Sequence, residues 1–233
     1  MRLGLALLAV CLPLVCLPLG VGIDSAIGAT AKEVAVDVGH SHLNPGVISV
    51  TGLPEFEYNR NLAYKVRERL EAAGVRVRMI GERGDFDVLH ERTLAARGAD
   101  LFVSIHHDSV QERFLPVADR FAGFSLFVSR NNPRVGKSRE CASAIGAEML
   151  KAGYSRSLYH ADPVLGESRP FADEANGVHY FDNLAVARTA TMPALLFEAG
   201  VLVNRDEEAR LARPETQAAM ANAIAQGVLR CLS

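Results

Sequence analysis

Three short apolar runs of the sequence each end in a side chain that could bind a metal ion or carry a proton. In chain order, the runs end at His40, His106 and Glu198. Runs of this length, rich in β-branched and aromatic residues, are typical of strands that are buried on both faces of a sheet. Open α/β sheets place their chemistry beyond the carboxyl ends of such strands. The sequence therefore predicts that two histidines and a glutamate converge at one edge of a sheet.

A third metal ligand is needed before two histidines make a catalytic site. Catalytic zinc sites commonly use three ligands of the His and Asp/Glu types and leave a fourth position for water. An early glutamate, Glu57 or Glu55, could complete the set with His40 and His106. Glu57 opens a predicted helix, where the commoner role of a glutamate is a favourable interaction with the helix dipole. The residues alone leave this choice open.

Glu198 closes a run of buried residues, and a carboxylate there is costly unless it is paired or functional. The alternative to a functional role is a structural ion pair. A zinc ion makes hydroxide available near neutral pH and polarises a carbonyl group. The hydroxide could then attack the carbonyl carbon of an amide. Glu198 would then take the proton of the water and pass it to the departing amine as general base and acid.

Length and composition indicate one folded domain. The chain has 233 residues, of which 49% are hydrophobic and 22% are charged. About 200 residues remain when the N-terminal segment is set aside, which is the usual span of one domain. The net charge of -2 and the pI near 6.4 argue against nucleic-acid binding, which needs a concentrated basic face.

The N-terminus is typical of an export signal. Arg2 precedes an apolar stretch at 3–19, and Ala29-Thr30-Ala31 forms an A-x-A cleavage pattern. We therefore expect a signal peptide at 1–31, a catalytic domain at 32–233, and a periplasmic, extracellular or cell-wall location. An uncleaved membrane anchor is the alternative, and no transmembrane span remains if the signal is cleaved. Cys141 and Cys231 could then form a disulfide or remain two buried thiols.

The periodicity predicts α/β alternation. Strands are expected within 34–40, 75–79, 101–105, 123–128 and 194–198, and helices at 57–73, 87–97, 138–150 and from Pro214 onwards. The stretch at about 153–180 lacks periodicity and exceeds ordinary connection lengths, which favours a functional loop or lid.

Four blocks of the sequence resemble, in order, the zinc-dependent N-acetylmuramoyl-L-alanine amidases of the Amidase_3 type. The first block is Asp37-Val38-Gly39-His40, similar to a D-P-G-H strand end, and the second is a helix-opening glutamate five residues before a leucine. A strand ending in S-I-H follows. The last block has a P-x-x-L-x-E-x-G-x-x-x-N pattern. The residues that match the last three blocks are Glu57, Leu62, Ser104, Ile105, His106, Pro193, Leu196, Glu198, Gly200 and Asn204.

The resemblance implies a single α/β domain with a twisted mixed β-sheet flanked by helices. It implies that His40, Glu57 and His106 bind Zn²⁺, because the family spacing selects Glu57 over Glu55, and that Glu198 is the catalytic carboxylate. The implied substrate is peptidoglycan, cut at the amide between N-acetylmuramic acid and L-alanine. Val38 and the loop 41–46 depart from the family pattern, and His42 and His107 are expected to be solvated loop histidines.

Other functions use the same residue types. A different exported zinc hydrolase, a carboxypeptidase or a deacetylase, could use these ligands, and a metal-free wall-binding module would have no need of Glu198. The segment 153–180 could regulate the enzyme by placing Glu167 or Glu174 over the zinc, or it could simply line the substrate site. The sequence leaves open whether a protein activator is needed.

Overall fold

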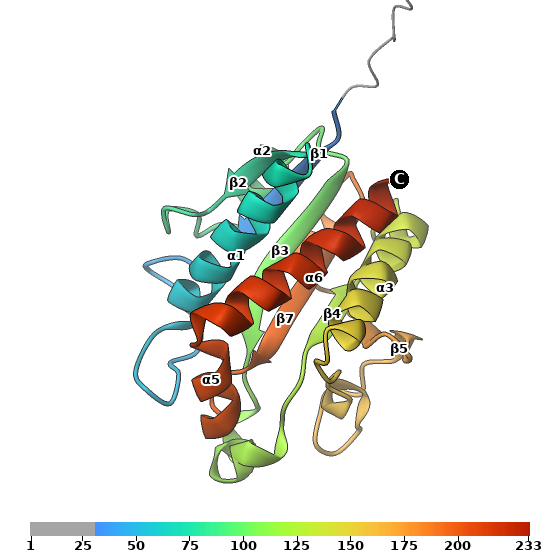
Figure 1. Ribbon diagram of the computed structural model, residues 1–233. Helices are drawn as coiled ribbons and strands as arrows, with labels where there is room; N and C mark the ends of the chain where they lie inside the picture. Colours follow the sequence, from blue (N-terminus) through green and yellow to red (C-terminus); the bar gives the residue numbers. More distant parts are fainter. Residues whose placement is uncertain (1–30) are drawn as a thin grey trace, which may run out of the picture. The chain divides into compact units, whose positions relative to one another are not determined.

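A seven-stranded mixed β-sheet forms the centre of the domain (Figure 1). The computed structural model describes residues 31–233, so the expected signal peptide lies outside the described residues except for its last residue. The strand order is β2-β1-β3-β7-β4-β6-β5. The strands are β1 (Glu33–Val38), β2 (Arg76–Ile80), β3 (Leu101–Asp108), β4 (Ser125–Val128), β5 (Phe171–Asp173), β6 (Val178–Tyr180) and β7 (Ala194–Val201). The predicted α/β class with a mixed sheet is confirmed.

The direction of the strands changes in the middle of the sheet. β2, β1, β3 and β7 are parallel, whereas β4 runs antiparallel to β7. β6 is parallel to β4, and β5 is antiparallel to β6. The carboxyl ends of β1, β3 and β7 therefore meet at one edge, which is where the three apolar runs were expected to bring their polar ends.

Helices cover both faces of the sheet. The long helices α1, α3 and α6 pack on one face (Figure 1), and α2 and α4 pack on the other. The helices are α1 (Glu55–Ala72), α2 (Leu89–Ala95), α3 (Val135–Lys151), α4 (Ala185–Arg188), α5 (Arg205–Leu211) and α6 (Pro214–Leu232), with 3₁₀ helices η1 (Glu112–Arg120) and η2 (Tyr159–Ala161). Within residues 31–233, no helix is both long and apolar enough to span a membrane.

Alternation along the central strands decides which side chains share a face. Leu101, Val103 and Ile105 of β3 point into the core beneath α1, α3 and α6. Phe102 packs on the opposite face, and His106 shares that parity. The register pairs His106 with Glu198 across β3 and β7. These two side chains are therefore direct neighbours on the face that α2 and α4 cover.

The segment 153–180 is more regular than the sequence indicated. It contains η2 and the two strands β5 and β6, and β6 pairs with β4 as part of the main sheet. Strands of three residues are too short to show a periodic pattern, which is why the sequence indicated an irregular insert. Deleting the whole segment would remove two strands, so such a deletion would not test a lid on its own.

A disulfide joins two of the helices on the same face. Cys141 of α3 and Cys231 of α6 are bonded, with Cα atoms 4.9 Å apart and a sequence separation of 90 residues. Both side chains are buried in the core beneath the helices. Of the two alternatives that the sequence left open, the structure shows the disulfide.

Replacing both cysteines by serine is expected to lower the free energy of unfolding by about 2–4 kcal/mol, because the cross-link closes a long loop in the unfolded chain. Urea unfolding of Cys141→Ser/Cys231→Ser and of wild type, with and without reductant, measures the difference. Wild type with reductant is the matched control and should approach the variant. Equal midpoints for all samples would show that the bond does not stabilise the fold.

Candidate metal centre

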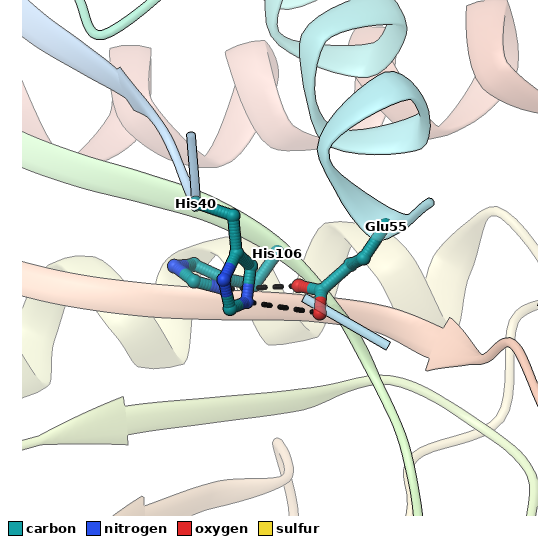
Figure 2. Close-up of side chains that lie close together, drawn as sticks. All are labelled: His40, Glu55 and His106. Atoms are coloured by element: carbon teal, nitrogen blue, oxygen red, sulfur yellow. Dashed lines mark hydrogen bonds and ion pairs between the residues drawn. The ribbon is translucent and has the colours of Figure 1, made fainter. Parts of the chain in front are cut away.

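Three side chains from different parts of the chain converge at the carboxyl edge of the sheet (Figure 2). His40 follows β1, His106 lies near the end of β3, and Glu55 is the first residue of α1. His40 Nε2 lies 2.9 Å from Glu55 Oε2, and His106 Nδ1 lies 3.0 Å from Glu55 Oε1. One potential ligand atom of each residue lies within 4.8 Å of the others, so the three could hold one metal ion.

Glu57 does not join the two histidines, contrary to the choice that the family spacing indicated. Its carboxylate is half-buried and pairs with Arg60, with Arg60 Nη2 2.5 Å from Glu57 Oε2. Successive helical residues are about 100° apart, so Glu55 and Glu57 point to nearly opposite sides of α1. Glu55 faces the ends of β1 and β3, and Glu57 faces outward.

Glu55 is held from several directions at once. It is 4% exposed, and Asn59 Nδ2 donates to its Oε1 at 3.1 Å. The backbone N–H of His107 also donates to Oε1, at 3.2 Å, and that of Val47 donates to Oε2, at 3.3 Å. Burial disfavours a charge on Glu55, but hydrogen bonds from His106 and His40 outweigh burial and keep its pKa below the usual value. The carboxylate is therefore an anion fixed between two imidazoles.

His40 occupies an uncommon backbone conformation that aims its ring at Glu55. Its φ of 69° lies in the left-handed region, where non-glycine residues are uncommon and are found at functional sites. His40 Nδ1 lies 3.1 Å from the carbonyl oxygen of Asn44. A proton on Nδ1 satisfies that contact, so Nε2, which contacts Glu55 in this structure, is the atom that could bind a metal ion, the usual arrangement of metal-binding histidines.

Arg92 of α2 supports the turn that carries His40, and nothing in the sequence singled this residue out. Its side chain is buried, and it donates to Asp37 Oδ1 at 2.8 Å and to the carbonyl oxygen of His40. Ser104 Oγ donates to the other oxygen of Asp37 at 2.6 Å. A carboxylate in the middle of an apolar strand needs a cation, so Asp37 was the signal that could have pointed to a buried arginine.

His107 is not a solvated loop histidine. It is 2% exposed, its Nδ1 lies 2.8 Å from Asn59 Oδ1, and its ring packs against Tyr58. Burial lowers the pKa of His107 to about 3, so the imidazole is neutral. His42 is exposed, as expected, and its ring packs edge-on against Phe56. Neither imidazole faces the three converging side chains.

Two glycines leave the room that the three side chains occupy. A Cβ atom at Gly39 would come within 2.2 Å of His106 Nε2, and one at Gly46 would come within 2.4 Å of Glu55 Oε2. Gly46 also has a φ of 79°, which favours glycine. The site therefore depends on the absence of side chains at these positions as well as on its ligands.

Gly39→Ala is expected to weaken zinc binding by about 10- to 100-fold, as changes to the surroundings of metal ligands typically do, because the new methyl group pushes the His106 ring aside. Competition with a chromophoric chelator measures the affinity. Gly136→Ala in α3 is the matched control, since no atom lies within 4 Å of the added Cβ. Wild-type affinity in the Gly39 variant would mean that His106 is not a ligand.

Glu198 lies beside the three residues. It is the register neighbour of His106, it is partly exposed, and its Oε2 is buried without a hydrogen-bond partner in the described part of the chain. Burial, together with the carboxylates of Asp108, Glu55 and Glu167, holds the pKa of Glu198 well above its usual value. A carboxyl group with a raised pKa beside a possible metal site is a candidate general base and acid.

The segment around η2 closes over the neighbouring end of β3. His160 Nε2 lies 2.7 Å from Asp108 Oδ2, and His160 Nδ1 lies 2.8 Å from Glu167 Oε2. Burial alone would lower the pKa of His160, but the two carboxylates raise it to about 9. Glu167 is thus engaged with His160, and Glu174 is exposed in the turn between β5 and β6. Neither lies among His40, Glu55 and His106 in the structure of residues 31–233.

A cavity of about 310 Å³ opens beside the two histidines. Phe86, Leu89 and Val186 form apolar walls, and Asn44 and Asp87 add polar groups. The converging residues therefore have space for part of a substrate next to them, on the face that α2 and α4 cover. Imidazole nitrogens and a carboxylate with a neighbouring cavity are the donor set of a catalytic zinc site, so the residues present fit such an ion.

Comparisons with known proteins identify the family of the chain. A family model described as N-acetylmuramoyl-L-alanine amidase matches residues 34–230. The chain is 27% identical to N-acetylmuramoyl-L-alanine amidase AmiC of Neisseria meningitidis over 86% of its own length and 52% of that protein. It is 25% identical to amidase AmiA of Escherichia coli, over 85% of its length and 75% of that protein.

A solved structure extends the likeness to the fold. The catalytic domain of CwlV, an N-acetylmuramoyl-L-alanine amidase from Bacillus (Paenibacillus) polymyxa var. colistinus, superposes with a TM-score of 0.68 at 26% identity. The match covers 86% of this chain and 98% of the CwlV structure. Because the family model covers nearly all of the described residues, the chain belongs to the N-acetylmuramoyl-L-alanine amidase family.

Proposed function

We propose that this protein is a zinc-dependent peptidoglycan amidase that hydrolyses the amide bond between N-acetylmuramic acid and the L-alanine of the stem peptide. The observation that carries the proposal is the convergence of His40, Glu55 and His106 beside Glu198 at the carboxyl edge of the sheet. Family membership and the names of the similar proteins support the substrate. The chain spans about half of the Neisseria relative, so its activity is proposed for this domain on its own.

His40, Glu55 and His106 would hold the zinc ion, with Glu55 in the place that the sequence pattern indicated for Glu57. When bound, zinc lowers the pKa of a water molecule and polarises a carbonyl group. The contacts from Asn44, Asn59 and the backbone keep the three side chains in place before the ion binds. Preorganised ligands of this kind reduce the cost of assembling the site.

Glu198 would act as general base and then as general acid. It accepts the proton of the attacking water and later donates it to the nitrogen of the departing L-alanine. Its raised pKa suits both steps, and its register neighbour His106 lines the cavity that could take part of the substrate. Because Oε2 is buried, Oε1 is the oxygen that would exchange the proton with water and substrate.

The disulfide supports export of the protein. Disulfides persist in oxidising compartments and are rare in the cytosol, and Cys141–Cys231 joins two helices of the domain core. A periplasmic, extracellular or cell-wall location would give the enzyme access to peptidoglycan. Sequencing the N-terminus of the exported protein tests whether the chain begins at residue 32, as the cleavage pattern indicates.

Mass spectrometry of fragments released from purified peptidoglycan sacculi tests the proposed reaction. We expect free stem peptides that begin with L-alanine. Their release should stop on treatment with a chelator and return with added zinc. Shortened stems would identify a carboxypeptidase, and deacetylated sugars would identify a deacetylase. If sacculi bind without any release, and binding survives the chelator, the domain is a wall-binding module.

A further inference from the structure

Two buried polar atoms that lack hydrogen-bond partners among residues 31–233 belong to residues at paired positions of β4 and β7. Ser125 is the register partner of Glu198 in this antiparallel pair, so both side chains lie on the same face of the sheet. Ser125 is 0% exposed. Neither Ser125 Oγ nor Glu198 Oε2 has a hydrogen-bond partner among residues 31–233. Buried polar groups are nearly always hydrogen-bonded, so two such atoms at opposite positions call for one explanation.

The other neighbour of Glu198 in the sheet is engaged with a different carboxylate. His106 lies opposite Glu198 on β3, but its Nδ1 is engaged with Glu55 at 3.0 Å. The opposite edge of its ring lies against Gly39, since a Cβ there would meet His106 Nε2 at 2.2 Å. Ser125 Oγ, by contrast, has no hydrogen-bond partner among residues 31–233 and is available to donate.

We propose that Ser125 is a positioning residue for Glu198, and this rests on the function proposed above. Its hydroxyl donates a hydrogen bond to Glu198 Oε2, either directly or through one ordered water. Directly opposite residues of antiparallel strands have Cβ atoms about 4.5–5.5 Å apart, so a rotamer change of the longer side chain or a single bridging water spans the gap. A hydroxyl that donates to a carboxylate makes a short, strong hydrogen bond.

This contact would fix the orientation of the general base. A carboxyl group that is free to rotate presents either oxygen to the reaction, whereas one with Oε2 anchored in the sheet presents Oε1 alone. A catalytic group must be held close to its productive geometry by such supporting contacts. Ser125 acts through Glu198, so its loss should slow the chemical step and leave substrate binding unchanged.

Crystal structures test the contact directly. In wild type we expect Ser125 Oγ within about 3.0 Å of Glu198 Oε2, or both atoms bonded to one water. In Ser125→Ala we expect Glu198 to change rotamer or to become disordered. A wild-type structure in which Oε2 bonds a different group, with Ser125 turned away from it, overturns the proposal.

Kinetics on peptidoglycan fragments test the role. Ser125→Ala is expected to lower kcat by about 10- to 100-fold, the usual effect of losing a hydrogen bond to a charged group, with KM and zinc content unchanged. Ser125→Thr keeps the hydroxyl and should recover most of the loss. Ser129→Ala is the matched control, because Ser129 is also buried beside β4 but bonds the carbonyl oxygen of Asp182 at 2.9 Å.

The results separate a positioning role from a structural one. Equal kcat in Ser125→Ala and wild type, or a threonine variant that folds and is as slow as the alanine variant, overturns the proposal. A loss of activity in Ser129→Ala as large as that in Ser125→Ala would also count against it, since it would reflect general destabilisation. If wild type releases no stem peptides, the proposed function fails. The crystal structures would still show whether Ser125 contacts Glu198.

Discussion

Glu198→Gln is expected to lower kcat by about 10²- to 10⁴-fold, the range that a general acid/base contributes. Glutamine keeps the shape of the side chain but cannot accept the proton of water. Zinc affinity should stay at the wild-type value, because Glu198 lies beside the three converging ligands and is not one of them. Release of stem peptides over time and a zinc titration, both on the purified variant, check the two parts.

The free energy of unfolding of Glu198→Gln shows whether its lost activity comes from lost chemistry or from misfolding. Glu198 carries a buried Oε2 without a partner among residues 31–233, and its neighbours include the carboxylates of Asp108 and Glu167. Removing its charge should therefore leave the free energy of unfolding unchanged or raise it. Glu174→Gln is the control, since Glu174 is exposed in a turn and should keep full activity. Activity above a tenth of wild type in Glu198→Gln would remove Glu198 from the mechanism.

The second large effect is expected at the carboxylate ligand. Glu55→Gln should weaken zinc binding by more than about 100-fold, which exceeds the effect typical of changes around the ligands, and should abolish hydrolysis. The two carboxylate oxygens of Glu55 face His40 Nε2 and His106 Nδ1. In glutamine one of these oxygens becomes an uncharged NH₂ group, which donates hydrogen bonds and cannot bind a metal ion. Zinc content after dialysis, measured by atomic emission, gives the direct readout.

Glu57→Gln is the matched control for this experiment. Glu57 lies on the same turn of α1 but pairs with Arg60 on the outer side, so its variant should retain stoichiometric zinc. The opposite outcome, with zinc lost on substitution of Glu57 and kept on substitution of Glu55, would restore the ligand set that the family spacing implied. If both variants retained zinc, neither glutamate would be a zinc ligand, and the proposed ligand set would be wrong.

The central strands could be predicted because their environment leaves a mark on the sequence. β1, β3 and β7 are buried on both faces, and such strands appear as continuous apolar runs. The order and length of these runs were enough to place their polar ends at one edge of the sheet. β5 and β6 have three residues each, and β6 joins the main sheet by pairing with β4, which precedes α3 in the sequence. No local pattern marks them.

Helical geometry explains why Glu55, and not Glu57, lies with the two histidines. Glu55, Asn59 and Leu62 are buried on one side of α1, at the spacing of a helical stripe. Extending the apolar stripe backwards from Leu62 by about two turns reaches Asn59 and then Glu55. The predicted helix began at Glu57, two residues after its first residue in the structure, and the family spacing selected this glutamate, which lies on the outer side.

The support around the site was beyond prediction for a different reason. Arg92 reaches Asp37 and the backbone of the turn at His40 from a helix that lies 55 residues further along the chain than Asp37. Neither the type of Arg92 nor its spacing distinguishes it from the other arginines of the sequence. Tertiary contacts of this kind become visible only when the strands and helices are assembled.

The uneven cover of the sheet has a consequence for how the domain opens. On one face, three long helices pack together and two of them are cross-linked by Cys141–Cys231. On the other face, α2 has seven residues and α4 has four, lengths at which helices are marginal without their packing. Backbone amides of α2 and α4 should therefore exchange hydrogen through local opening, whereas those of α3 and α6 should wait for global unfolding. The face that carries His106 and Glu198 is thus the part of the domain that can open locally while the cross-linked face stays folded.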